Sequence, residues 1–274
     1  MNTKPTQNSA EETAGSINCN LQGLSVLVTR PVAQSDSLCE LIEQAHGRPV
    51  RFPAMEIAAV ADAEAARATL GQILQTDMLI FISKNAVQYA FPLMPEALPA
   101  NLAIAAVGQA TADELSEYGL EPTLVPAQRF DSEGLLSLPE LQDMQGKHVI
   151  IVRGNGGRSH LRSELENRGA RVDYAEVYQR LLPNRNPANL LAGWHRLVDV
   201  VTATSNQLLD NLFTLLGDEG GDLLQSTPLI VISPRMAEYA EKLGCQQIYL
   251  ADNASDGAIL AELCLLLSEA NDES

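Results

Sequence analysis

One pattern of strand, polar turn and helix occurs twice in this chain of 274 residues. At residues 79–91, LIFISKNAVQYAF, an apolar run typical of a buried strand leads through a polar turn into an amphipathic helix. Residues 200–212, VVTATSNQLLDNL, follow the same order and again carry an asparagine at the turn. Asn85 and Asn206 are 121 residues apart, which suggests a longer repeat with this spacing.

A second pair of segments keeps nearly the same separation. Residues 24–57 resemble residues 148–180, and each has an apolar run closed by an arginine, a polar turn, a helix, a glycine and a short second strand. The two closing arginines, Arg30 and Arg153, are 123 residues apart. This pair begins before the first one along the chain and shows nearly the same offset, which indicates a duplicated unit.

A third pair completes the repeat, because residues 103–126 resemble residues 228–251, with Gly108 and Ser233 separated by 125 residues. Strands that alternate with helices predict parallel sheets with right-handed crossovers. The strands are almost continuously apolar, which suits sheets covered by helices on both faces. The sequence therefore predicts an α/β fold with two doubly wound parallel-sheet domains of similar, repeated architecture.

Composition limits the kind of ligand and the surroundings of the chain. With 18 basic and 35 acidic side chains, the formal charge is −17, which argues against binding to nucleic acid or to an anionic membrane. A small anionic ligand stays possible, since a few arginines can create a local positive field. The most apolar stretch, residues 258–267, is too short to cross a bilayer. We expect a monomer in the cytoplasm.

The cysteines and histidines give no sign of a metal site or a disulfide framework. No CxxC or HExxH pattern is present, and we expect no metal. We read the cysteines as reduced thiols in a cytosol. They are widely spaced along the chain: Cys19, Cys39, Cys245 and Cys264.

The turns at the carboxyl ends of the strands are the expected ligand site of a doubly wound sheet. They are rich in serine, asparagine, glycine and arginine, which can bind anions through backbone N–H groups and side chains. An N-capping role for the serines and surface ion pairs for the arginines are the alternatives. The turn RGNGGR lacks a full GxGxxG or a Walker lysine, so nucleotide binding is not expected. The candidate binding residues are Arg30, Ser83, Lys84, Asn85, Gly108, Thr111, Arg153, Gly154, Ser205, Asn206, Ser233 and Arg235.

An ordered series of segments resembles the uroporphyrinogen-III synthase family over about residues 24–267. In chain order it reads VLVTRP, FPAMEI, FISKNAV, AVGQATADEL, RGNGGRSHLRSEL, VYQR, TATSNQ and VISPRMAEYA. The resemblance implies that the chain leaves its first domain early and returns to it later. The implied division is a disordered tail over 1–20, a discontinuous domain of 21–52 and 181–274, linker strands 53–57 and 176–180, and a second domain of 58–175.

The resemblance also implies a cofactor-free reaction in a cleft between the domains. The family cyclises the linear polycarboxylate hydroxymethylbilane to uroporphyrinogen III, with loss of water and inversion of the terminal pyrrole ring, through azafulvene and spiro intermediates. The preceding pathway enzyme could hand over this substrate. An alternative function is a non-catalytic two-domain module that bends at a hinge and binds a small anionic metabolite.

A tyrosine in the VYQR segment is the catalytic candidate that the resemblance implies. Tyr178 matches the family's tyrosine, and a phenol is protonated at neutral pH, so it can donate a proton to the departing hydroxyl. The alternative is that Tyr178 only packs between domains. Tyr174 lies four residues earlier, and strand parity predicts that it shares a face with Tyr178. Only the motif match separates the two.

Overall fold

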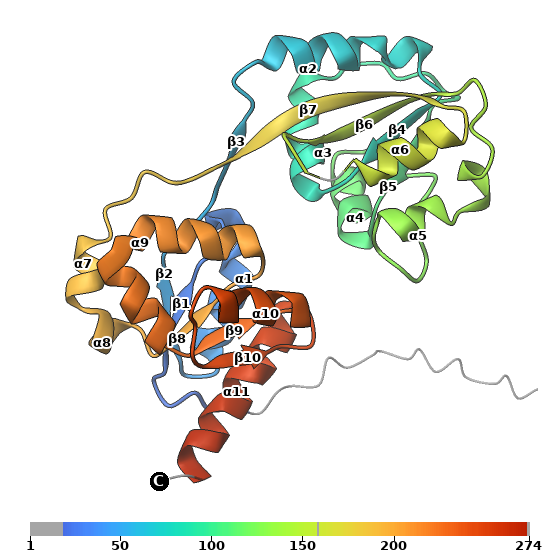
Figure 1. Cartoon of the computed structure of the whole chain (residues 1–274). Helices are drawn as coiled ribbons and strands as arrows, with labels where there is room; N and C mark the ends of the chain where they lie inside the picture. Colours follow the sequence, from blue (N-terminus) through green and yellow to red (C-terminus); the bar gives the residue numbers. More distant parts are fainter. Residues whose placement is uncertain (1–18, 158, 273–274) are drawn as a thin grey trace, which may run out of the picture. The chain divides into compact units, whose positions relative to one another are not determined.

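The computed structural model describes residues 19–157 and 159–272. The described residues up to Met55, together with those from Leu182 onward, form one compact unit, which we call unit 1; Glu56–Leu181 form the other, unit 2. Each unit is described by itself (Figure 1). The tail predicted over 1–20 lies, apart from its last two residues, outside the described residues.

Unit 1 is a five-stranded parallel sheet of order β10-β9-β8-β1-β2. Its strands are β1 Ser25–Val28, β2 Arg48–Arg51, β8 Val200–Thr202, β9 Leu229–Val231 and β10 Ile248–Leu250. Its helices are α1 Asp36–Gln44, α7 Ala188–Ala192, α8 Trp194–Leu197, α9 Asn206–Ser226, α10 Pro234–Lys242 and α11 Asp256–Asp272, with a 3₁₀ turn at Val32–Gln34. Helix α9 is kinked at Gly217, whose φ of 66° lies in the left-handed region that glycine tolerates.

The core of unit 1 joins α1 and α11 to one face of this sheet. Leu38 and Ile42, spaced as one stripe of α1, pack with Val26 of β1 and Ile259 of α11. A disulfide connects Cys19 to Cys264 of α11, so the expectation of four reduced thiols was wrong for this pair. The reason is tertiary: the two cysteines are 245 residues apart, and no sequence spacing reveals that the chain brings them together. Cys39 and Cys245 are free and buried.

Unit 2 is a five-stranded sheet of order β3-β7-β6-β4-β5. Its strands are β3 Glu56–Ala59, β4 Met78–Phe81, β5 Ala103–Ala106, β6 His148–Gly154 and β7 Arg171–Leu181. Its helices are α2 Ala63–Leu70, α3 Lys84–Ala90, α4 Gln109–Glu117, α5 Ser132–Leu136 and α6 His160–Asn167, with 3₁₀ turns at Gly71–Gln75, Phe91–Leu93 and Pro139–Leu141. Only β3 runs antiparallel, and it pairs with the end of β7.

Helices cover both faces of the unit 2 sheet. On one face α2, α3 and α4 form a hydrophobic cluster with residues such as Leu70, Val87 and Leu115. On the other face α5 and α6 contribute Leu135 and Leu165 to a second cluster. Buried strands between two helical layers explain the nearly continuous apolar runs in the sequence. The predicted fold class, two doubly wound sheets of similar architecture, is confirmed.

The segments expected as linker strands lie next to each other at the edge of the unit 2 sheet. Residues 56–59 pair with residues 178–181 in antiparallel register. The first paired segment therefore begins three residues after the start of the linker predicted at 53–57. The second begins two residues after the start of the linker predicted at 176–180. Within the described residues, no helix is long and apolar enough to span a bilayer.

Candidate active site

The carboxyl ends of β4, β5 and β6 place several predicted residues at one edge of the unit 2 sheet. Ser83 follows β4, Gly108 follows β5, and Arg153 and Gly154 end β6. Parallel neighbouring strands bring these ends together, as the sequence predicted. Thr111, further along α4, is buried at 6% exposure.

All three predicted serines act as helix N-caps. The Oγ atoms of Ser83, Ser205 and Ser233 accept hydrogen bonds from the backbone N–H groups three residues later. The N-capping alternative that the sequence left open is thus realised in α3, α9 and α10. A capping hydroxyl keeps its own hydrogen for a further contact.

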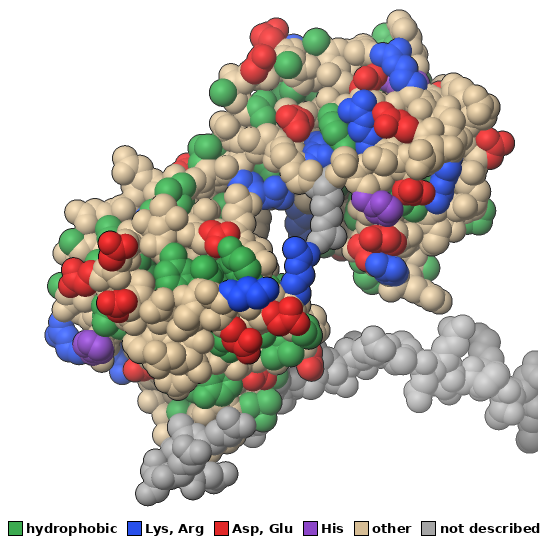
Figure 2. All heavy atoms as spheres, in the orientation of Figure 1, with side chains coloured by type: hydrophobic (Ala, Val, Ile, Leu, Met, Phe, Trp, Pro, Cys, Tyr) green, Lys and Arg blue, Asp and Glu red, His purple; other side chains and the backbone are tan. Residues whose placement is uncertain are grey.

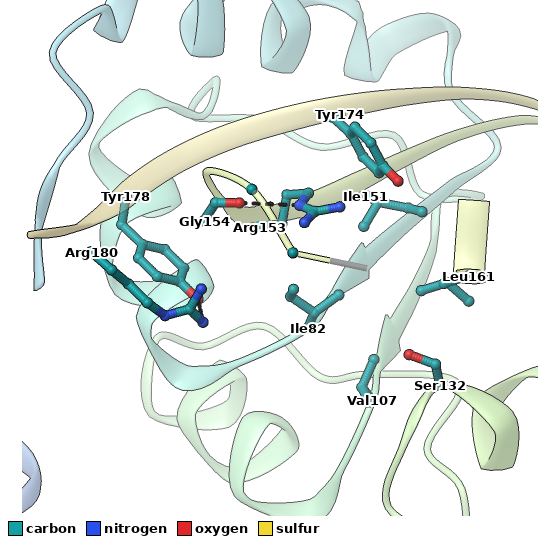
Figure 3. Close-up of a pocket in the computed structure, with 12 residues that line it drawn as sticks. Ile82, Val107, Ser132, Ile151, Arg153, Gly154, Leu161, Tyr174, Tyr178 and Arg180 are labelled. Atoms are coloured by element: carbon teal, nitrogen blue, oxygen red, sulfur yellow. Dashed lines mark hydrogen bonds between the residues drawn. The ribbon is translucent and has the colours of Figure 1, made fainter. Parts of the chain in front are cut away.

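Tyr178 lies across the end of β6, with its ring packed on Gly154 (Figure 3). The ring is fully buried, and its centroid is 6.0 Å from that of Tyr89. A Cβ atom at Gly154 would lie 2.5 Å from the Cε2 and Cζ atoms of Tyr178, so only glycine leaves room for the ring. Gly154, predicted as a binding residue, therefore has a clear packing role.

The hydroxyl of Tyr178 has two polar partners. Its Oη lies 3.2 Å from the Oγ of Ser83 and 3.3 Å from the Nη2 of Arg180. A guanidinium can only donate, so Oη accepts from Arg180. Ser83 can donate as well, and Oη then still has its own hydrogen to give. A hydrogen bond donated by either partner would stabilise a negative charge on Oη.

A β-bulge separates Tyr178 from Tyr174. Along β6 and β7 the register shifts between Arg153, which pairs with Glu176, and Gly154, which pairs with Tyr178. Tyr178 packs in the cluster under α2, α3 and α4, whereas Tyr174 packs against the cluster under α5 and α6. The parity argument for a shared face was wrong because it assumed a regular strand.

Tyr174 is in contact with two arginines. The Cζ atoms of Arg153 and Arg162 lie 4.5 Å and 4.9 Å from the centroid of its ring. Its Oη is buried and has no hydrogen-bond partner within the part of the chain that the structure describes. Arg153 itself is buried at 5% exposure and donates from Nε to the carbonyl of Gly154.

A pocket of about 230 Å³ extends between the two tyrosines. Its described lining includes Arg153 and Arg180 and contains no acidic side chain. Acidic side chains are instead spread over the face of the molecule drawn in Figure 2. In a chain of net charge −17, this pocket is a local exception that favours an anion. Sequence reasoning missed Arg180, although it lies two residues beyond Tyr178 in VYQR.

Other predicted residues have partners that the sequence could not show. Arg30 forms an ion pair with Asp256, and its Nη2 donates to the carbonyl of Ala254 at 2.7 Å, so the ion-pair alternative is realised. Lys84 lies 3.7 Å from Glu114. Asn85, Asn206 and Arg235 lie in the first turns of α3, α9 and α10, and their binding roles stay predictions.

Fold and pocket together define a class: a protein of two doubly wound α/β units with an arginine-lined pocket at the strand ends of unit 2. The family model described as uroporphyrinogen-III synthase HemD matches residues 36–261. The uroporphyrinogen-III synthase of Escherichia coli K12 is 32% identical over 252 residues, which cover 88% of this chain and 100% of that protein. That of Salmonella typhimurium LT2 is 33% identical, with the same coverage. The chain belongs to the uroporphyrinogen-III synthase family.

Solved structures support the same fold. The uroporphyrinogen III synthase of Thermus thermophilus, a mutant form, aligns with a TM-score of 0.60 at 18% identity and covers 89% of this chain and 99% of its own. The uroporphyrinogen-III synthetase of Helicobacter pylori aligns with a TM-score of 0.59 at 19% identity and the same coverage. The family resemblance inferred from the ordered segments is confirmed.

Proposed function

We propose that the chain converts hydroxymethylbilane to uroporphyrinogen III and that Tyr178 assists the loss of the terminal hydroxyl. Membership of the family supports the reaction. The arrangement around Tyr178 Oη supports its role, because Ser83 and Arg180 lie within hydrogen-bond distance of it beside an arginine-lined pocket.

The reaction requires the protein to position the reacting carbons and to donate one proton to the departing hydroxyl. The bond between the terminal carbon and its hydroxyl breaks, and the phenolic proton leaves with the hydroxyl as water. The pyrrole N–H proton passes to solvent, which gives the electrophilic azafulvene, and the phenolate takes a proton back from solvent. Attack by the substituted carbon of the far ring gives the spiro intermediate. The unassisted bilane closes without inversion, so the protein must hold the reacting carbons in a near-attack arrangement.

Arg180 links substrate binding to the acid. Tyr178 is fully buried in this structure, whereas Arg180 is exposed and donates to its Oη. A carboxylate of the substrate competes for the guanidinium and draws it away, which opens Oη to the departing hydroxyl. Ser83 stays in place as the cap of α3 and steadies the phenolate.

Replacement of Tyr178 by phenylalanine tests this role. We expect turnover to fall about a hundredfold without being abolished, because general acid assistance is worth about 10² to 10⁴ and the substrate is already reactive. Bilane consumption and the isomer recovered after oxidation are the readouts. Tyr118→Phe, at an exposed tyrosine of the same unit, is the matched control. Unchanged turnover in Tyr178→Phe would remove Tyr178 from the mechanism.

The same isomer assay separates the enzyme from a non-catalytic binding module. If the wild-type chain yields only the isomer that forms without inversion, the binding module is supported instead. We further propose that the chain works in the cytoplasm and receives its substrate from the enzyme that makes the bilane, because the free bilane closes by itself. The Cys19–Cys264 disulfide is the feature that argues against a reducing compartment.

A further inference from the structure

We propose that the hydroxyl of Tyr174 is a substrate-binding group that, with Arg153, forms a subsite for one carboxylate arm of the tetrapyrrole. This inference rests on the proposed function and names a part of the substrate for the pocket of unit 2. Tyr174 has no role in the proton transfer assigned to Tyr178.

The first observation is the orphaned hydroxyl. The Oη of Tyr174 is buried and has no hydrogen-bond partner among residues 19–157 and 159–272. A buried polar group without a partner is destabilising, and folded proteins rarely retain one without a use. A phenylalanine would fill the same space beside α5 and α6 without this cost. A ligand that accepts a hydrogen bond in the pocket supplies the missing partner.

The second observation is the positive charge over the ring that carries this hydroxyl. Guanidinium groups of Arg153 and Arg162 lie over the Tyr174 ring at 4.5 Å and 4.9 Å from its centroid. Arg162 also pairs with Glu166 at 2.7 Å and is not part of the described lining of the pocket, whereas Arg153 is. No acidic residue is found in the described lining of the pocket. A hydroxyl donor beside an arginine suits a carboxylate.

The third observation is the size of the pocket and the positions of the two tyrosines in its lining. At about 230 Å³ the pocket is smaller than the roughly 300–1,000 Å³ typical of sites that enclose a drug-sized ligand, so a whole tetrapyrrole does not fit. A single arm, or a ring with its arm, does. Tyr174 stands at one end of the pocket and Tyr178 with Arg180 at the other (Figure 3). An arm held at Tyr174 therefore directs its pyrrole ring toward Tyr178.

The substitution Tyr174→Phe tests the subsite, because it removes only the hydroxyl and keeps the ring under both arginines. We expect KM for hydroxymethylbilane to rise about tenfold, as for the loss of one hydrogen bond to a charged group, with kcat within about twofold of the wild type. We also expect Tm to stay the same or rise, because a buried unsatisfied group is lost. A purely structural hydroxyl would give a lower Tm and an unchanged KM.

A binding measurement gives a readout that does not depend on activity. The fluorescence polarisation of uroporphyrin, the oxidised octacarboxylate product, reports its Kd for the full-length chain, and Tyr174→Phe should weaken binding about tenfold. Tyr118→Phe is again the control. If Kd and KM are both unchanged in Tyr174→Phe, the subsite is refuted even though Tyr178→Phe still lowers kcat. If the wild type makes no inverted isomer, the proposed function fails, while the uroporphyrin titration still decides the subsite.

Discussion

The substitution Gly154→Ala tests how closely the packing of Tyr178 depends on a glycine at the end of β6. The added methyl group would lie 2.5 Å from Cε2 and Cζ of Tyr178 and 2.9 Å from Cδ2. Carbon atoms that are not bonded to each other prefer separations of about 3.5–4.0 Å, so the ring must move by about 1 Å or more. The ring is fully buried, and its Oη is within hydrogen-bond distance of Ser83. The ring therefore cannot move without losing packing contacts or this hydrogen bond.

The expected magnitude follows from this overlap. Overpacking a well-packed core costs about 1–3 kcal/mol, and a lost hydrogen bond about 1 kcal/mol more. We therefore expect the free energy of unfolding to fall by about 2–4 kcal/mol. Turnover should fall about a hundredfold, as in Tyr178→Phe, because the displaced phenol no longer reaches the departing hydroxyl. Urea denaturation followed by circular dichroism and the bilane assay measure the two effects.

A double-mutant cycle shows whether the cost arises from the tyrosine ring. In a Tyr178→Ala background the space is empty, so Gly154→Ala should cost no more than about 0.5 kcal/mol. Gly71→Ala is the matched control in the same unit, because no atom lies within 4 Å of its added Cβ. An equal loss of stability in both backgrounds, or full turnover in Gly154→Ala, would show that the reasoning is wrong.

Three further predictions concern stability. Hydrogen bonding from the backbone N–H of His148 lowers the pKa of Asp77, so the ionised carboxylate stabilises the fold at neutral pH. This stabilisation is lost as the pH falls through the lowered pKa. In urea titrations from pH 7 to about pH 3, the free energy of unfolding should therefore fall more steeply in the wild type than in Asp77→Asn. Cys264→Ser should lower the Tm of unit 1 in non-reducing buffer, because the disulfide with Cys19 is lost. A reductant should lower the Tm of the wild type but not that of Cys264→Ser. Equal Tm values for the two proteins in non-reducing buffer would show that the disulfide does not stabilise the fold. Ser205→Ala should cost about 1 kcal/mol in urea, because α9 loses its N-cap.

The fold could be predicted because its signals are local. An apolar strand, a capping residue and a helical stripe each lie within about 15 residues, and their recurrence revealed the duplication. The contacts of Arg30 could not be predicted in the same way. Its ion-pair partner Asp256 lies 226 residues away along the chain, and its binding role stays a prediction. The disulfide of Cys19 has the same long-range origin.

The pocket could be predicted only in part, and the reason is a single irregularity in β7. Strand ends located Ser83, Arg153 and Gly154, but the roles of the two tyrosines depend on the bulge, and regular alternation cannot show it. One extra residue, Val177, lies between the residues that pair with Arg153 and with Gly154.

The bulge explains how one strand can offer two different hydroxyl groups to one pocket. In a regular strand, alternation would direct Tyr178 to the same face as Tyr174. The extra residue instead turns Tyr178 over Gly154 toward Ser83, while Tyr174 stays beside Arg153. Bulges often re-aim side chains in this way next to active sites. Under the two proposals above, a binding hydroxyl and an acid hydroxyl four residues apart would serve different steps, because their surroundings differ although their chemistry is the same.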